Sequence, residues 1–475
     1  MHAVIALVLA ATVAACDSPL KPDLARMYRV EAASPDDTPV ILIPGLFGSK
    51  LRSRTTGTER WPGRWDRVLF GDYRDLELAF DPITLEVLPD DLEAFDIADS
   101  VLGRDYYGPI IDALVRFGGY VPATPGTPVK KGERRYYLFP YDWRQDNVKH
   151  AKGLEALIET VRRDYGRPDL RVDIVAHSMG GVIARYYLRY GTVDVLGGMP
   201  SLITLHGTRR VRKLILLGSP NFGAVSALQS YLVGEPIGLK QMRPEILTTM
   251  SSGYQLFPHP IANWLIDASA KTLPDDLYEP ATWERYRWNV YDPTAVARIR
   301  AERGPDADAY LAALRKYFAY QLERARRLSW MLSTPEPATP IRYVLFGGDC
   351  TLTPARIAIE DVDGLPRTRL KPEDVRGGAS AALEQAMLEP GDGRVTKPSL
   401  LARETLDPTA PQNEESFLPI AYYFFLCERH NRLTSNINFQ DNLLNVLLTP
   451  NLPWETQTMP GMRDAPAAGS RARSR

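Results

Sequence analysis

The stretch RVDIVAHSMGGVIARYYLRY, residues 171–190, decides the fold. Its first part, 171–175, is a mostly apolar, β-branched run that is typical of a strand buried on both faces of a parallel sheet. The chain then passes through small residues around Ser178 and continues with apolar residues at helical spacing. A sharp turn at the serine requires small residues two positions before and after it, and Ala176 and Gly180 meet that need. The stretch therefore predicts a strand, a tight turn that exposes the Ser178 hydroxyl, and a helix.

Similar apolar runs elsewhere predict the rest of a sheet. Four more candidate strands and two flanking helices alternate along the chain, the strands at 39–43, 136–140, 211–217 and 341–346 and the helices at 152–165 and 436–448. This alternation predicts an α/β fold with a mostly parallel central sheet. Residues 220–340 break the rhythm with helical stretches such as 309–331. They are predicted to form a large helical cap, or lid, inserted between two strands of the one sheet.

Composition excludes several classes of protein. The chain has 475 residues, with 57 Lys and Arg against 58 Asp and Glu, so its formal net charge is -1. This balance argues against a nucleic-acid binder, which usually has a basic excess. The share of apolar residues, 44%, is that of a soluble globular protein. Three cysteines are too few for a disulfide scaffold, and no spacing typical of a metal site is present.

The two ends of the chain are predicted to lie outside the folded part. Residues 3–15 form an apolar run that is too short to span a bilayer and suits a signal peptide. The residues before Cys16, Val13-Ala14-Ala15, resemble a bacterial lipobox. We therefore expect a lipoprotein signal peptide at 1–15, lipidation of Cys16 and a linker at 16–35. The expected location is outside the cytoplasm, on a bacterial membrane facing the periplasm or the cell exterior, and 451–475 is expected to be a disordered tail.

An unactivated serine hydroxyl is a weak nucleophile and needs a base. Where a serine stands at such a turn, the order along the chain is serine, acid, histidine. Five of the six histidines are unsuitable because they precede Ser178, adjoin it, or leave no room for an acid before them: His2, His150, His177, His206 and His259. Elimination leaves His430. Cys350 and Cys427 are left to pair or to stay free, and the sequence does not decide between the two.

Local chemistry leaves the acid open between two aspartates. Asp392 stands in a Gly-Asp-Gly turn, whereas Asp349 directly follows the strand predicted at 341–346, and Asp361 and Asp363 are weaker options. Either of the first two carboxylates is suited to orienting a histidine ring.

Two backbone amides are expected to bind the oxyanion. The amide of Met179 stands at the positive end of the helix after the serine. The second donor should come from the glycine-containing loop after residues 39–43, where Leu46 is the first choice and Phe47 the alternative.

These residues together resemble the lecithin:cholesterol acyltransferase family of α/β-hydrolases, which includes phospholipid:diacylglycerol acyltransferases and lysosomal phospholipase A2. The resemblance covers about residues 36–450. It depends on these motifs: VILIPGLFGSKL at 40–51, YDWR at 141–144, AHSMGG at 176–181, LGSPNFGA at 217–224, SSGYQLFP at 251–258 and GDGRV at 391–395.

The resemblance implies an α/β-hydrolase fold in which Ser178 is the nucleophile, Asp392 the acid and His430 the base, with Leu46 and Met179 as oxyanion donors. Asp349 becomes the runner-up acid. The implied core has two parts, 36–219 and 341–450, separated by the cap. Two departures from the family are the lack of cysteine in 52–75 and the presence of Arg394 where the family usually has a small residue.

The implied activity is acyl transfer from a phospholipid or acylglycerol to an alcohol or water through an acyl-enzyme, with no metal or cofactor. The resemblance also implies a membrane-docking insertion at about 52–75, in which Trp61 and Trp65 suit a bilayer interface. The expected partners are a lipid substrate, an alcohol acceptor and a membrane surface, but no nucleic acid, and the chain is expected to be a monomer. The alternatives are a triacylglycerol lipase or carboxylesterase and, in another class, an inactive lipid-binding scaffold.

Overall fold

The computed structural model describes residues 21–449 except 35, 99, 102–103, 199–201, 336, 338, 340, 342, 379 and 408–417. The predicted signal peptide, Cys16 and the predicted tail at 451–475 lie outside the described residues. Within the described part, no helix combines the length and the apolar character needed to cross a membrane.

A seven-stranded sheet forms the centre, in the order β19-β14-β10-β9-β1-β8-β7. Every neighbouring pair is parallel. The five predicted strands are present, and two edge strands extend the sheet beyond them. The strands are β1 (Val40–Ile43), β7 (Val121–Pro122), β8 (Arg135–Leu138), β9 (Val172–His177), β10 (Val211–Leu217), β14 (Tyr343–Gly348) and β19 (Ile420–Leu426).

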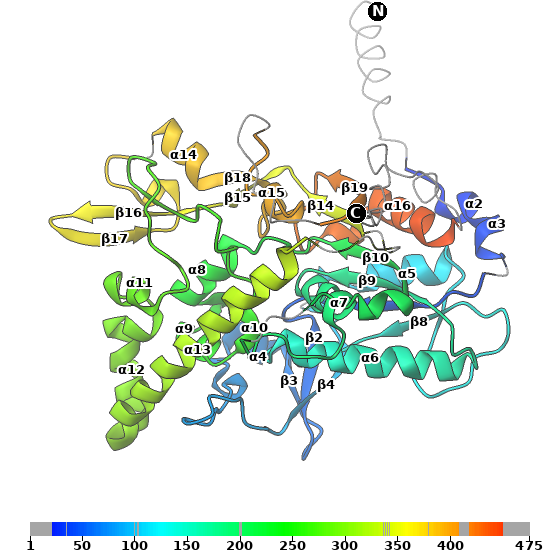
Figure 1. The fold of residues 1–475 in the computed structure, drawn as a ribbon, viewed down its shortest axis with the longest axis horizontal. Coiled ribbons are helices and arrows are strands. Elements are labelled where there is room, and N and C mark those ends of the chain that lie inside the picture. Colours follow the sequence, from blue (N-terminus) through cyan, green and yellow to red (C-terminus); the bar gives the residue numbers. More distant parts are fainter. Residues whose placement is uncertain are drawn as a thin grey trace, which may run out of the picture.

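Helices cover both faces of this sheet, so its strands are apolar on both sides. Alternate residues of β1 show the two faces: Ile41 and Ile43 belong to one buried cluster and Val40 and Leu42 to the other. The first cluster packs against α6 and α7, and the second against α5 and α16 (Figure 1). These helices are α5 (Gly108–Arg116), α6 (Asn147–Asp164), α7 (Met179–Tyr190) and α16 (Ile437–Leu448). The fold is therefore that of an α/β-hydrolase, as predicted.

The cap follows β10 and lies beyond one end of the sheet (Figure 1). It is mainly helical and contains one small hairpin. Its elements are α8 (Val225–Val233), β11 (Glu235–Ile237), β12 (Lys240–Met242), α9 (Pro244–Thr248), α10 (Ser251–Tyr254), β13 (Leu265–Asp267), α11 (Pro280–Arg285), α12 (Pro293–Arg303) and α13 (Ala307–Ser333).

The predicted boundary at residue 340 does not separate the cap from the rest in space, because β13 pairs with β16. Residues beyond β14 thus return to the cap before the chain re-enters the sheet at β19. The elements of this return are β15 (Thr351–Pro354), β16 (Ile357–Val362), β17 (Leu365–Arg369), α14 (Ala381–Met387), β18 (Leu388–Gly391) and α15 (Lys397–Leu400).

A second sheet, in the order β3-β2-β4, follows β1 and contains the predicted docking insertion. Its strands and the adjoining helix are β2 (Ser49–Ser53), β3 (Glu59–Trp61), α4 (Trp65–Phe70) and β4 (Leu92–Ile97). The short remaining helices and strands before α5 are α2 (Leu24–Met27), α3 (Arg29–Ala32), the 3-10 helix η1 (Arg74–Leu76), β5 (Ser100–Val101) and β6 (Arg104–Asp105).

The prediction of a linker at 16–35 is wrong for its second half, because that half contains the short helices α2 and α3. Leu24 and Tyr28 are buried in the cluster that contains α16, and the Tyr28 hydroxyl donates to the backbone oxygen of Asp441 at 2.7 Å. The side chains of Leu24 and Tyr28 bury apolar area against α16, so the folded part begins before residue 36.

Candidate active site

Ser178 lies between β9 and α7, at the carboxyl edge of the sheet. Its φ of 52° and ψ of -122° are a conformation that few non-glycine residues adopt. The close approach of the turn to β1 also demands glycine at 180, since a Cβ there would lie 2.6 Å from the Pro44 carbonyl oxygen. The motif thus folds into the predicted strand, turn and helix, with the serine at the strained apex.

The structure brings Ser178, His430 and Asp392 into one line of hydrogen bonds. The Nε2 of His430 lies 3.0 Å from the Ser178 Oγ, and its Nδ1 lies 2.8 Å from Asp392 Oδ2. With the proton on Nδ1 the ring donates to the carboxylate, so Nε2 is free to accept from the hydroxyl. The three side chains are therefore arranged for proton transfer from serine to histidine.

The Asp392 carboxylate is held on both oxygens. Oδ2 faces His430, while Oδ1 accepts from the amides of Arg394 at 2.9 Å and Val395 at 2.8 Å. The backbone amide of His430 also donates to the carbonyl oxygen of Asp392 at 2.8 Å. Since the side chain of Asp392 is fully buried, these bonds leave it little freedom to rotate.

Asp349, the alternative candidate for the acid, does not face His430. Its Oδ2 accepts from Lys397 Nζ at 2.8 Å, and Asp392 occupies the position beside the His430 ring. Local chemistry left the acid open between these two aspartates, and the structure places the carboxylate that the family resemblance favoured, Asp392, beside the His430 ring.

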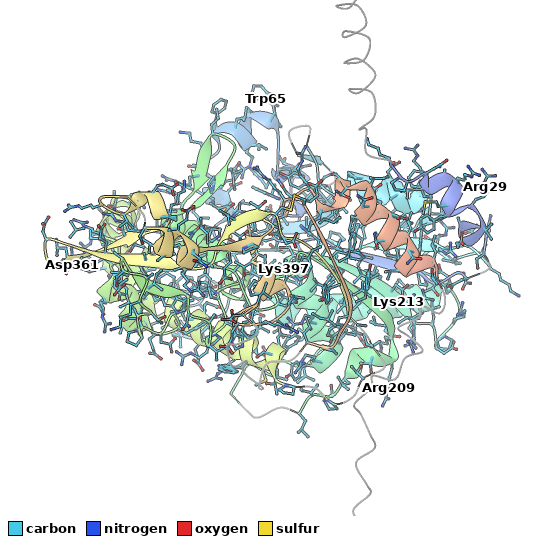
Figure 2. The ribbon with its side chains drawn as sticks, turned by 90° about the horizontal axis from the view of Figure 1, so that it is seen from above. Arg29, Trp65, Arg209, Lys213, Asp361 and Lys397 are labelled. Atoms are coloured by element: carbon cyan, nitrogen blue, oxygen red, sulfur yellow. A yellow bond between two sulfur atoms is a disulfide. The ribbon has the colours of Figure 1, made fainter. Side chains whose placement is uncertain are left out.

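A disulfide joins Cys350 to Cys427, a pairing that the sequence left open. Cys350 follows Asp349 at the end of β14, and Cys427 stands three residues before His430. The bond therefore fastens the loop of the histidine to the adjacent strand (drawn in yellow in Figure 2).

The loop of the predicted oxyanion donor is held by the YDWR motif. The Tyr141 hydroxyl donates to the Pro44 carbonyl oxygen at 2.8 Å, and the Trp143 ring nitrogen donates to the Ser49 carbonyl oxygen at 3.1 Å. Leu46 lies in the tight turn between these two points. The buried Arg144 pairs with Asp142 at 2.8 Å and with Asp90 at 2.7 Å, which fixes the motif itself.

Met179, the other predicted donor, is the first residue of α7. Its amide is one of the four at the start of a helix that have no acceptor within the helix, so it is available to an anion at the serine.

A pocket with mainly apolar walls adjoins the loop of the predicted oxyanion donor, residues 44–49, which we call the oxyanion loop. It lies between that loop and the first helices of the cap, and it contains one acidic side chain, Glu235. The lining residues are Leu46, Phe47, Ala227, Ser230, Tyr231, Glu235, Leu247, Met250, Ser252, Gly253 and Leu256. Mainly apolar walls with a few polar groups are typical of a pocket that binds an apolar ligand.

The two tryptophans of the predicted docking insertion have opposite environments. Trp61 is only 5% exposed, packs against Phe47 and Trp143, and donates from its ring nitrogen to the Phe47 carbonyl oxygen at 2.8 Å. The prediction that Trp61 contacts a membrane is therefore wrong, because burying this ring supports the oxyanion loop. Trp65 is 63% exposed and projects from α4 (Figure 2).

Sequence reasoning missed two residues next to these groups. Tyr107 contacts both Gly45 and His177, and Glu235 pairs with Arg394, two positions after the acid. Arg394 stood out only as a departure from the family, and nothing in the local sequence of Tyr107 or Glu235 indicated a place near Ser178.

The resemblance to the lecithin:cholesterol acyltransferase family is confirmed by a family model with that description, which matches residues 131–294. The match includes Ser178 and Met179 but ends well before Asp392 and His430. No curated protein matches the sequence.

Solved structures resemble this chain at low sequence identity. A chain of the Tle4-Tli4 complex is 14% identical, with a TM-score of 0.52 over 86% of this chain and 98% of that one. The lipase BlEst2 of Bacillus licheniformis in its mature form is 11% identical, with a TM-score of 0.32 over 88% and 94%. Lipase 1 from Pelosinus fermentans is 14% identical, with a TM-score of 0.32 over 88% and 100%. The first of these likenesses supports a common architecture.

Proposed function

We propose that the chain is a serine-dependent enzyme that transfers acyl groups from lipid esters to an alcohol or to water. The observation that carries this proposal is the unbroken line from Asp392 through His430 to Ser178. The family match over residues 131–294 supports a lipid acyltransferase or hydrolase in particular.

The first half of the reaction forms an acyl-enzyme. The Ser178 Oγ attacks the ester carbonyl carbon while His430 Nε2 takes the hydroxyl proton. The carbonyl oxygen becomes an anion, which the amides of Leu46 and Met179 stabilise. The carbon–oxygen bond to the leaving alcohol then breaks, and the imidazolium returns the proton to that alcohol. Asp392 stays ionised and balances the charge on the ring.

The second half releases the acyl group. An alcohol or a water molecule gives its proton to His430 and attacks the ester at Ser178, and the serine recovers the proton as it leaves. How well the pocket excludes water determines whether an alcohol or a water molecule accepts the acyl group. The apolar walls at Leu247, Met250 and Leu256 support a long acyl chain as the transferred group.

The acceptor is tested by incubating purified protein with labelled phospholipid, with and without candidate lipid alcohols. A new lipid ester that is absent with Ser178→Ala would establish a transferase. Release of free fatty acid alone would leave a triacylglycerol lipase, phospholipase or carboxylesterase. No product from any ester, with folded protein, would favour the inactive lipid-binding scaffold.

We also propose that α4 and the β11–β12 hairpin contact a membrane surface. Trp65 and Phe70 of α4 are 63% and 55% exposed, and Leu239 at the hairpin tip is 72% exposed. The amide of Leu239 donates to the Leu69 carbonyl oxygen at 3.2 Å, which joins the hairpin to the helix. Neighbouring exposed apolar side chains of this kind suit insertion at an interface.

Vesicle co-sedimentation tests this surface. Trp65→Ser and Leu239→Ser should each weaken binding to phospholipid vesicles. Leu202→Ser is the matched control, since Leu202 is 88% exposed but lies outside α4 and the hairpin. Equal binding by all three variants and the unaltered protein would exclude the surface.

Export with a lipid anchor at Cys16 remains our proposal for the location. The Cys350–Cys427 disulfide supports an oxidising compartment. Labelling with radioactive palmitate in a bacterial host should be lost with Cys16→Ala, and an unprocessed chain in the cytosol would contradict it.

A further inference from the structure

A chain of hydrogen bonds connects the oxyanion loop to the loop of His430. The amide of Gly45 donates to the Tyr107 hydroxyl oxygen at 2.8 Å. That oxygen lies 2.8 Å from Nδ1 of His177, and Nε2 of His177 lies 3.3 Å from the carbonyl oxygen of His430. Tyr107 and His177 are both buried. Neither side chain takes part in the mechanism described above, although Tyr107 contacts Gly45 and His177 immediately precedes Ser178.

The two ends of this chain determine the direction of each bond. A carbonyl oxygen only accepts, so His177 Nε2 must carry a hydrogen and donate to His430. In a neutral ring Nδ1 then carries none and accepts the hydroxyl proton of Tyr107. The Tyr107 oxygen is left to accept from the Gly45 amide. Each group therefore has one partner of the right kind, and no alternative tautomer satisfies all three bonds.

His177 stays uncharged in this position. The pKa of His177 is lowered to about 3, chiefly by burial and also by the neighbouring His430 ring, against the opposing effects of the hydrogen bond to the His430 backbone and of Asp392. The centres of the His177 and His430 rings are 4.9 Å apart. A charged ring at this distance would oppose the imidazolium that acyl transfer requires on His430, and a neutral ring does not.

The loop at Gly45 passes close to both the nucleophile and His177. A Cβ at Gly45 would lie 2.8 Å from the Ser178 Cβ and 3.2 Å from His177 Nδ1. The Gly45 amide immediately precedes that of Leu46 in the chain. A change in the position of Tyr107 would therefore move the oxyanion donor relative to the nucleophile.

We propose that Tyr107 and His177 are positioning residues that hold the oxyanion loop and the catalytic base, His430, in one fixed geometry. This inference rests on the proposed function. Because acyl transfer needs the oxyanion donor and the base aligned together, loosening either end should reduce the rate of the chemical step and leave substrate binding intact.

Kinetics of Tyr107→Phe test the proposal. Rates are measured with a p-nitrophenyl ester and divided by the concentration of active sites, titrated with a fluorophosphonate. We expect kcat per active site to fall about 10- to 100-fold with KM unchanged, as for a small displacement of reacting groups. Tyr137→Phe is the matched control: Tyr137 lies on β8, its buried hydroxyl is 3.3 Å from the carboxylate of Asp164 at the end of α6, away from Ser178, and kcat should be unaffected.

Two variants of His177 give a second test. His177→Gln keeps an amide that can donate to the His430 carbonyl, and it should retain more of the kcat per active site than His177→Leu. If both variants and Tyr107→Phe merely melt at lower temperature and keep the original kcat per active site, the role is structural and the proposal is wrong. These variants decide the matter even if Tyr107→Phe fails to fold.

Failure of the proposed function would look different. Absence of turnover and of labelling at Ser178 in the unaltered protein would overturn the enzyme assignment, and the positioning role with it. Normal turnover in the unaltered protein that is lost with Ser178→Ala, combined with an unchanged kcat in Tyr107→Phe, would overturn the positioning role alone.

Discussion

His430 Nε2 lies 3.0 Å from Ser178 Oγ, although 252 positions separate the two residues in the chain. The contact follows from the parallel sheet, because Ser178 directly follows β9 and His430 follows β19 at the same edge. Parallel strands expose their carboxyl ends together, so loops from distant parts of the chain meet there.

The assignment of Asp392 as the acid can be tested by replacing one carboxylate at a time. Asp392→Asn removes the group that orients His430, and kcat for ester hydrolysis should fall by about three to four orders of magnitude, as in a serine protease with the equivalent change. Asp349→Asn is the control, since its carboxylate pairs with Lys397. A larger loss in Asp349→Asn than in Asp392→Asn would mean that the acid is misassigned.

The disulfide should stabilise the fold and the histidine loop. Cys350 and Cys427 are 77 positions apart, and a disulfide is typically worth about 2–4 kcal/mol of unfolding free energy. We expect denaturant unfolding of the double variant Cys350→Ser, Cys427→Ser to show this loss. Dithiothreitol should destabilise the unaltered protein but not the double variant. Equal sensitivity of both proteins to the reductant would count against the assignment.

The pair between Glu235 and Arg394 should restrain the hairpin that borders the pocket. The Arg394 Nη1 lies 3.2 Å from Glu235 Oε2, and the Ser230 hydroxyl donates to the same oxygen at 2.5 Å. Glu235→Gln removes the charge that holds Arg394, so amide hydrogen exchange in residues 235–242 should accelerate. Arg300→Gln is the control, because the exposed pair of Arg300 with Asp308 lies away from the hairpin. Unchanged exchange in Glu235→Gln would contradict the restraint.

Stability should fall with acid because buried histidines are held uncharged. Burial lowers the pKa of His177 and His259 to about 3 and that of His150 to about 4. In the unfolded chain a histidine has a pKa of about 6.5, so between these values the unfolded state binds more protons. The stability is therefore complete above pH ~6.5 and is lost progressively as the pH falls from there towards the folded pKa values.

Denaturant unfolding from pH 7 to 4 measures this effect. Each such histidine contributes at most about 1.4 kcal/mol per pH unit. His259→Gln should therefore flatten the dependence relative to the unaltered protein, since Gln does not titrate. Parallel curves for the two proteins would contradict the assignment of a neutral His259.

Much of the site could be predicted because its chemistry is local. Strand, turn and helix around Ser178 are encoded within twenty neighbouring residues, and His430 follows from elimination among six histidines. The Gly-Asp-Gly turn at Asp392 was separable from Asp349 only through the family resemblance, because both positions allow a carboxylate to reach a ring.

The errors came from contacts between distant segments. Trp61 and Trp65 are four positions apart in the same aromatic segment, and packing against Phe47, Tyr73 and Trp143 buries the first of them. The pairing of β13 with β16 joins the cap to a region predicted as core, and Tyr107 reaches His177 across 70 positions. Such contacts depend on topology, which composition and periodicity do not specify.

The central claim, that Ser178 becomes acylated with the help of His430, is tested most directly by intact-protein mass spectrometry after brief reaction with a fluorophosphonate. We predict one added phosphonyl group on the unaltered protein, mapped to Ser178 by peptide analysis, none on Ser178→Ala, and strongly slowed addition to His430→Ala. A folded, unaltered protein that gains no mass, or one that gains it at another residue, would contradict the account.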